Sequence, residues 1–214
     1  MSSVRVKICG IRSLKDAFMA IEEGADSLGF VFATSPRQLS ADEVLAITSK
    51  IPPFVSVTGV FVNEKKERVL DIAAKSLLDT LQFHGEEDEV YCRFFEGFRV
   101  IKAFGASHSL DYEKVSRYPA DAFLLDTKYK DKKGGGGMTF NWKLALPFSG
   151  KKHPLILAGG LTPGNIFSAL EAVNPYAVDV SSGVESVGIK DRKKVRAFLD
   201  EVRRFNILRR NDCE

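Results

Sequence analysis

The sequence predicts an α/β fold, a single-domain (β/α)8 TIM barrel, from three observations. Eight short apolar segments alternate with eight helix-like segments and begin at intervals of about 20 to 33 residues, the spacing of strand–helix–strand units. Several of the strands lack polar alternation, as expected for parallel strands that helices cover. The 214 residues lie near the lower limit, about 200 residues, for eight such units. Length does not exclude a doubly wound open sheet, which stays the alternative.

The expected strands are rich in β-branched and aromatic residues. They cover residues 4–9, 26–32, 54–62, 79–83, 99–104, 121–126, 154–158 and 176–180. The expected helices cover residues 14–23, 41–51, 65–75, 86–95, 110–117, 142–146, 163–173 and 190–205. The first and last helices have the clearest apolar spacing on one face, and the sixth is short and weak.

Composition excludes disordered, fibrous and membrane-spanning classes. The chain is 44% hydrophobic and 28% charged, and no apolar run approaches the roughly 18 residues of a membrane span. A net charge of +3 favours neither nucleic acid nor an anionic membrane as a partner. The basic residues 192–194 and 203–204 are expected on the solvated face of the last helix. Three cysteines and no secretory signal at the N-terminus indicate a reducing, cytoplasmic location.

No linker rich in Gly, Pro or Ser divides the chain. One domain is therefore expected over residues 1–208, followed by a C-terminal tail at 209–214. The low-complexity segment at residues 128–137 follows the sixth strand and is either a mobile loop or a lid over a site.

Two strands end in residues that a purely apolar core would not contain. Cys9 ends the first strand on the same face as Lys7, and both are expected to point into the barrel. The ammonium of Lys7 would lower the pKa of the Cys9 thiol below its usual value of about 8.5. Asp126 ends the sixth strand, where burial would raise its pKa. The alternatives are an inert buried cysteine and an aspartate that caps the next turn.

Further polar residues follow other strands. Asp179 and Ser181 share one face of the eighth strand, and Ser35 and Pro36 form a rigid turn that presents Arg37. An arginine suits a bidentate grip on a carboxylate. His84 follows the fourth strand, where a hydrogen-bonded structural role is the usual one.

Two glycine-containing segments favour phosphate binding. Gly159 and Gly160 follow the seventh strand, and Ser182 and Gly183 follow the eighth. Barrels commonly bind phosphate with the loops after these two strands, through backbone amides that a side chain would obstruct. The alternative is a pair of tight turns. The cysteines and histidines have no metal-ligand spacing, and no metal or organic cofactor is expected.

These segments together resemble the phosphoribosylanthranilate isomerase family, in order along nearly the whole chain. The matching motifs are KICGI at residues 7–11, GAD at 24–26, LGFVF at 28–32, SPR at 35–37, GVFVN at 59–63, QFHG at 82–85, LDT at 125–127, LAGGL at 157–161 and DVSSGVE at 179–185. The resemblance implies a (β/α)8 barrel that rearranges N-(5-phosphoribosyl)anthranilate to 1-(2-carboxyphenylamino)-1-deoxyribulose 5-phosphate in tryptophan biosynthesis. It also implies a small phosphorylated substrate, no cofactor, and either a monomer or a homodimer.

The resemblance also assigns roles to individual residues. The family's general base falls on Cys9, and its general acid falls on Asp126. The arginine that holds the anthranilate carboxylate falls on Arg37. The remaining substrate-binding positions, with Asp179 near the sugar hydroxyls and the others around the phosphate, are Asp179, Gly159, Gly160, Ser181, Ser182 and Gly183.

Three departures from the family pattern stand out. Met138 occupies the place of a usual lysine, Asn141 that of an aspartate, and Phe83 that of a leucine. Asn and Asp cap helices equally well, whereas Met138 could alter closure of the glycine-rich loop. Two alternatives remain: another phosphosugar barrel enzyme, such as an epimerase or indole-glycerol-phosphate synthase, and a non-catalytic barrel that binds a phosphorylated ligand.

Overall fold

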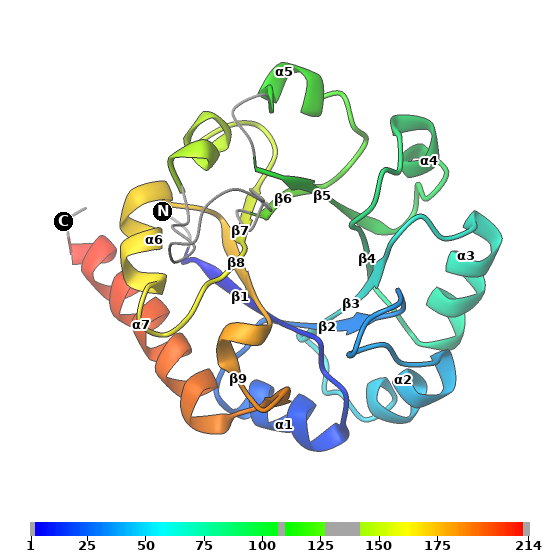
Figure 1. Cartoon of the computed structure of the whole chain (residues 1–214), viewed down its shortest axis with the longest axis horizontal. Helices are drawn as coiled ribbons and strands as arrows, with labels where there is room; N and C mark the ends of the chain where they lie inside the picture. The colour runs from blue at the N-terminus through cyan, green and yellow to red at the C-terminus, as the bar shows by residue number, and fades with distance from the viewer. Residues whose placement is uncertain (1–2, 107–109, 127–141, 212–214) are drawn as a thin grey trace, which may run out of the picture.

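A closed eight-stranded parallel barrel forms the centre of the molecule, and helices surround it (Figure 1). The structure, a computed structural model, describes residues 3–106, 110–126 and 142–211. The barrel strands are β1 (Arg5–Cys9), β2 (Ser27–Val31), β3 (Ser56–Phe61), β4 (Thr80–Phe83), β5 (Arg99–Gly105), β6 (Ala122–Asp126), β7 (Leu155–Ala158) and β8 (Ala177–Val180). Parallel pairing of β8 with β1 closes the barrel, so the predicted (β/α)8 fold is confirmed and the open sheet is wrong.

The outer layer follows the expected order. Its helices are α1 (Leu14–Glu22), α2 (Ala41–Thr48), α3 (Lys66–Lys75), α4 (Glu89–Arg93), α5 (Tyr112–Val115), α6 (Ile166–Val173) and α7 (Arg192–Asn211). Side chains make several of the N-terminal caps, and at α2 Ser40 and Glu43 form a reciprocal capping box. No helix among the described residues is long and apolar enough to cross a membrane.

Several elements differ from the expectation. The sixth helix is the 3-10 helix η1 (Trp142–Phe148), which contains Pro147, a residue without a backbone N–H to donate. Helix α7 continues through Arg209–Arg210 to Asn211, so part of the expected tail is helical. After β8 the chain forms a 3-10 turn, η2 (Ser182–Val184), and a hairpin of β9 (Glu185–Ser186) and β10 (Ile189–Lys190) that the sequence analysis did not predict.

The core has two layers because successive strand residues point to opposite sides. The larger layer fills the space between strands and helices and includes Phe30, Phe61 and Phe83. The smaller layer consists of alternating residues that face into the barrel, namely Ile101, Ala103, Ala122, Leu124, Ile156, Ala158 and Ala177. The strands β1, β3, β4 and β8 instead contribute buried polar side chains, which include Lys7, Thr58, Gln82 and Asp179.

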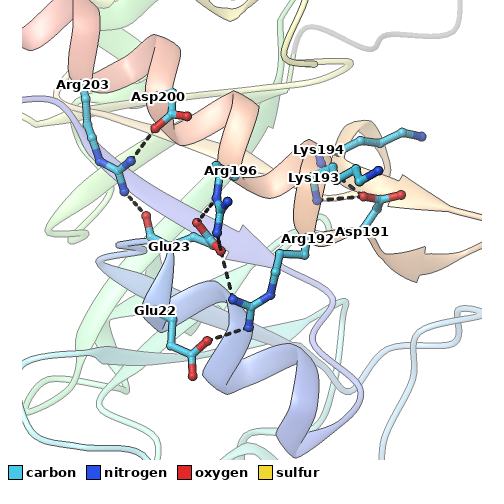
Figure 2. A network of polar contacts seen from close by, with 9 residues as sticks. All are labelled: Glu22, Glu23, Asp191, Arg192, Lys193, Lys194, Arg196, Asp200 and Arg203. Carbon is cyan, nitrogen blue, oxygen red and sulfur yellow. Dashed lines mark hydrogen bonds and ion pairs between the residues drawn. The ribbon is translucent and has the colours of Figure 1, made fainter.

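Ion pairs between α7 and α1 join the end of the chain to its beginning (Figure 2). Arg196 binds Glu23 through two hydrogen bonds of 2.8 and 2.9 Å, and Arg192 reaches both Glu22 and Glu23. Arg203 donates to the carbonyl of Glu23. The bidentate contact of Arg196 is the main reason why the pKa of Glu23 lies below its usual value. The expectation of a solvated face is confirmed for Arg192 and Arg203, whose side chains are 50% and 49% exposed, and both residues also bind the end of α1.

An aspartate just before a strand repeatedly anchors the preceding strand at the N-terminal end of the barrel. Asp26, Asp79 and Asp121 accept hydrogen bonds of 2.7 to 2.8 Å from the amides of Val6, Val57 and Val100. The repetition indicates a structural role for these carboxylates at the end of the barrel opposite to Cys9 and Asp126.

Replacing Asp79 by alanine is expected to lower the free energy of unfolding by about 1 to 2 kcal/mol, since a charged acceptor is lost from an amide and from the Ser56 and Thr80 hydroxyls. Urea denaturation measures this loss. The control is Asp42→Ala, which removes an ion pair of an aspartate side chain that is 77% exposed and should cost under about 1 kcal/mol. Equal losses in the two variants would contradict the anchoring role.

Candidate active site

Cys9 and Lys7 lie side by side on the inner face of β1. A Cβ atom placed on Gly29, the neighbour of Cys9 on β2, would lie 2.8 Å from Cys9 Sγ and 3.0 Å from Lys7 Cε. The shared inward orientation predicted for the two side chains is confirmed. Glycine at position 29 leaves the space that the thiol and the lysine chain occupy.

Burial dominates the ionisation of Cys9. It raises the pKa of the thiol above its usual value, and the nearby ammonium groups of Lys7 and Lys190 offset only part of the shift. The carboxylate of Asp179 adds to the increase. The prediction of a lowered Cys9 pKa is therefore wrong, because it counted the attraction of Lys7 and omitted desolvation.

Asp179 faces Lys7 in the barrel interior. One carboxylate oxygen, Oδ2, lies 3.1 Å from Lys7 Nζ, and both side chains are buried. The other oxygen, Oδ1, is buried without a hydrogen-bond partner among the residues that the structure describes. Burial lowers the pKa of Lys7, but Asp179 and Cys9 outweigh this effect and raise it, so an ammonium lies beside the Asp179 side chain in the barrel interior.

A chain of polar contacts runs from Lys7 to Asp126 across the C-terminal end of the barrel. Lys7 Nζ donates to Gln82 Oε1 at 2.8 Å, and Gln82 Nε2 lies 3.0 Å from His84 Nδ1. His84 Nε2 lies 3.7 Å from Asp126 Oδ2. The structure thus brings His84, expected only as a structural residue, to the carboxylate that ends β6.

Asp126 is less buried than expected. Its side chain is 32% exposed, and it neighbours His84 at the C-terminal opening of the barrel. The turn that Asp126 was alternatively expected to cap lies at residues 127–141, outside the described residues. That segment also contains Met138, Asn141 and the glycine-rich loop. A raised pKa for Asp126 stays a prediction.

Arg37 lies over the end of β1 with its guanidinium paired. Its Nε and Nη2 donate to the two carboxylate oxygens of Glu185 at 2.8 and 2.6 Å. A Cβ atom placed on Gly10 would lie 2.5 Å from Arg37 Cδ and 3.1 Å from Ser181 Oγ. Arg37, Ser181 and the end of β1 are therefore adjacent, as a common substrate site requires.

The two glycine-containing loops touch each other. Gly159 and Gly160 have φ angles of +92° and +62°, in the left-handed region that favours glycine. A side chain on Gly183 would overlap the carbonyl oxygen of Leu161. Both loops thus require glycine for backbone reasons, and the expected phosphate residues of β7 and β8 lie together at one end of the barrel. Within the described part of the chain, no three His, Cys, Asp or Glu side chains cluster as metal ligands.

Comparison with known proteins decides the family. The sequence pattern described as N-(5'-phosphoribosyl)anthranilate (PRA) isomerase matches residues 6–201. The chain belongs to the phosphoribosylanthranilate isomerase family. The N-(5'-phosphoribosyl)anthranilate isomerase of Geobacter metallireducens is 50% identical to it over 198 residues, which cover 92% of this chain and 97% of the relative.

Solved phosphoribosylanthranilate isomerase structures agree over the whole barrel. The enzyme of Thermotoga maritima superposes with a TM-score of 0.86 at 46% identity, covering 94% of this chain and 98% of that one. A complex with reduced 1-(o-carboxyphenylamino)-1-deoxyribulose 5-phosphate has a TM-score of 0.83 at 43% identity and the same coverage. A third structure, of monomers of the dimeric Thermotoga maritima enzyme, also has a TM-score of 0.83 at 43% identity and covers 94% of this chain and 98% of that one. The resemblance inferred from the motifs is confirmed.

Two neighbours of Arg37 were given no role by the sequence analysis. Glu185 is the last residue of the DVSSGVE motif, which resembles the phosphoribosylanthranilate isomerase family. The motif therefore includes Glu185, but it does not indicate what the side chain does. Lys190 was expected at the start of the last helix, but it lies on β10, where its buried Nζ donates to Glu185 Oε1 at 2.7 Å. No local sequence signal identifies this lysine, because the contact depends on the unforeseen β9–β10 hairpin.

Proposed function

We propose that this chain isomerises N-(5-phosphoribosyl)anthranilate to 1-(2-carboxyphenylamino)-1-deoxyribulose 5-phosphate, a step of tryptophan biosynthesis. The observation that carries the proposal is its relationship to the isomerase solved with the reduced form of that product, at 43% identity over 94% of this chain. The chain is accordingly an isomerase, and its substrate is a small phosphorylated molecule.

Cys9 and Asp126 supply the base and the acid of the proposed mechanism. Asp126 in its protonated form donates to the furanose ring oxygen, the C1–O bond breaks, and the nitrogen lone pair forms a Schiff base at C1. The Cys9 thiolate removes the proton from C2, and the electrons of that bond neutralise the Schiff base to give an enolamine. The Cys9 thiol then returns its proton to C1, and the C2 hydroxyl proton passes to the Asp126 carboxylate, which produces the ketone and restores both groups. Atoms and charge balance within the substrate and these two groups.

The remaining residues hold the substrate. Arg37 binds the anthranilate carboxylate, and the buried Oδ1 of Asp179 accepts a hydrogen bond from a sugar hydroxyl. Asp179 keeps its ion pair with Lys7 through the other oxygen. The phosphate lies against the two adjoining loops, with contacts from Gly159, Gly160, Ser181, Ser182 and Gly183.

Turnover of phosphoribosylanthranilate, made in situ from anthranilate and activated ribose phosphate, tests this function. Loss of the substrate's fluorescence is expected with the folded wild-type chain. Binding of the reduced product without any turnover would overturn the proposal and support a non-catalytic barrel that binds phosphorylated ligands.

We propose a homodimer as the assembly, in preference to a monomer. Its support is the dimeric state of the Thermotoga maritima relative, together with the fully exposed Phe54 beside a cavity of about 400 Å³ at the N-terminal end of the barrel. A second copy would cover this aromatic side chain. Light scattering should give twice the 23.7 kDa of one chain, and a mass of one chain would exclude the dimer.

We place the reaction in the cytoplasm, because a phosphorylated substrate does not cross membranes.

A further inference from the structure

We infer that Glu185 is a positioning residue, which presents Arg37 to the carboxylate of the substrate with Lys190 as its support. The inference rests on the proposed function, in which Arg37 binds that carboxylate. It adds a determinant of substrate specificity to the site: the enzyme would prefer a substrate whose aromatic amine bears an acidic group over one that lacks it.

The contact between Arg37 and Glu185 has a defined orientation. Two parallel hydrogen bonds, 2.8 and 2.6 Å long, hold one edge of the guanidinium. A guanidinium has five N–H donors, and the other three are free of hydrogen bonds to the residues that the structure describes. The Arg37 side chain is 26% exposed and that of Glu185 only 6%. Glu185 thus binds the inner edge and leaves the outer edge of the guanidinium for a ligand.

Lys190 keeps the cluster positively charged. A single Arg37–Glu185 pair would be neutral and would attract a substrate carboxylate weakly. Lys190, whose side chain is 1% exposed, donates to Glu185 Oε1 at 2.7 Å, and with all three groups ionised their charges add to +1. Burial lowers the pKa of Lys190, and its contact with Glu185 offsets part of that decrease. Arg37 and Lys190 both help to hold the pKa of Glu185 at about 2, so it stays ionised at neutral pH. The same lysine donates to the carbonyl of Ser181 at 3.1 Å, which links the cluster to the proposed phosphate loop.

The β9–β10 hairpin builds this cluster. Glu185 and Lys190 are partners in its antiparallel register, so their side chains project toward the same side. Arg12 donates to the carbonyl of Pro36 at 3.1 Å and to that of Gly188 at 2.9 Å, and so ties the turn before Arg37 to the turn of the hairpin. The hairpin is therefore held at two places to the turn that carries Arg37: by the Arg37–Glu185 ion pair and through Arg12.

The test uses two substrates, phosphoribosylanthranilate and the same molecule built on aniline, which lacks the carboxylate. Glu185→Gln removes the charge that orients Arg37 and should raise KM for the anthranilate substrate about tenfold or more, with kcat little changed. Its kcat/KM for the aniline substrate should equal that of the wild type. In the Arg37→Ala background, Glu185→Gln should cause no further loss, because the group it positions is absent.

Controls separate positioning from folding and from the proposed function. Glu22→Gln removes an Arg–Glu ion pair on the surface, at Arg192, and should leave both substrates unaffected. Glu185→Asp retains the charge with a shorter side chain, so it should show a smaller loss confined to the anthranilate substrate even if Glu185→Gln does not fold. If Glu185→Gln lowered kcat/KM equally for both substrates, or if its effect added to that of Arg37→Ala, the inference would be overturned and the proposed function would remain. An unchanged KM in Arg37→Ala would overturn the role of Arg37 itself, and the inference with it.

Discussion

Cys9→Ala should abolish turnover and leave binding of the reduced product nearly unchanged. The substitution removes the base that takes the C2 proton, whereas Arg37, Asp179 and the two glycine-containing loops remain in place. Loss of a positioned general base alone costs about 10² to 10⁴ in rate, and the other cysteine that the structure describes, Cys92, lies on α4 and cannot replace it. Fluorescence-based turnover and titration with the reduced product measure the two quantities. Near-normal activity would remove Cys9 from the mechanism.

Cys92 provides the matched control for this prediction. It is also a buried free cysteine, and burial is the main cause that raises its pKa to about 11, but it lies on α4 outside the barrel. Cys92→Ala should therefore keep the wild-type kcat.

The raised pKa of Cys9 gives a second readout. In Asp126→Asn, where the acid no longer titrates, the residual kcat/KM should increase as pH rises toward the Cys9 pKa, because the thiolate is the active form of Cys9. A residual kcat/KM that falls over the same range would contradict a thiolate base.

Asp126→Asn should lower kcat by at least about a hundredfold, with KM close to that of the wild type. Asparagine has a similar shape and can stay near His84, but it cannot donate a carboxylic proton to the ring oxygen. Steady-state kinetics separate the two parameters. A loss confined to KM would make Asp126 a binding residue and leave the acid unassigned.

Asp121→Asn is the control at the other end of β6. Asp121 lies just before β6 at the opposite end of the barrel, where it accepts a hydrogen bond from the amide of Val100. Its replacement should lower the free energy of unfolding and leave the kcat of the folded enzyme unchanged. A large loss of kcat in both variants would indicate damage to β6 rather than loss of an acid.

Local pattern was enough to predict which residues form the strands and which way they face. Each barrel strand lies within two residues of its expected position, as for β1 at Arg5–Cys9 against an expected 4–9. Alternation along β1 correctly placed Lys7 and Cys9 on one side, since side-chain direction repeats every two residues whatever the tertiary context. The proximity of the loops after β7 and β8 also followed from the fold class alone.

Contacts between distant segments were beyond the sequence analysis. The Cys9 pKa was predicted in the wrong direction because desolvation depends on every element around the thiol, whereas the charge of Lys7 is visible from the next position on the strand face. No protein partner was predicted for Arg37, and its partner Glu185 lies 148 residues away on a hairpin of two-residue strands. Strands that short have no periodicity to detect.

The sequence by itself therefore determined the barrel, the family and the chemical types of the residues at the C-terminal ends of the strands. Its motifs occur within single strands and turns, where backbone preference and side-chain alternation act over a few residues. Only the tertiary structure decided how those residues are paired: Lys7 with Asp179, His84 with Asp126, and Arg37 with Glu185 and Lys190. The physical reason is that charge, burial and hydrogen bonding act through space, and closing the barrel places residues far apart in the chain within 4 Å of one another.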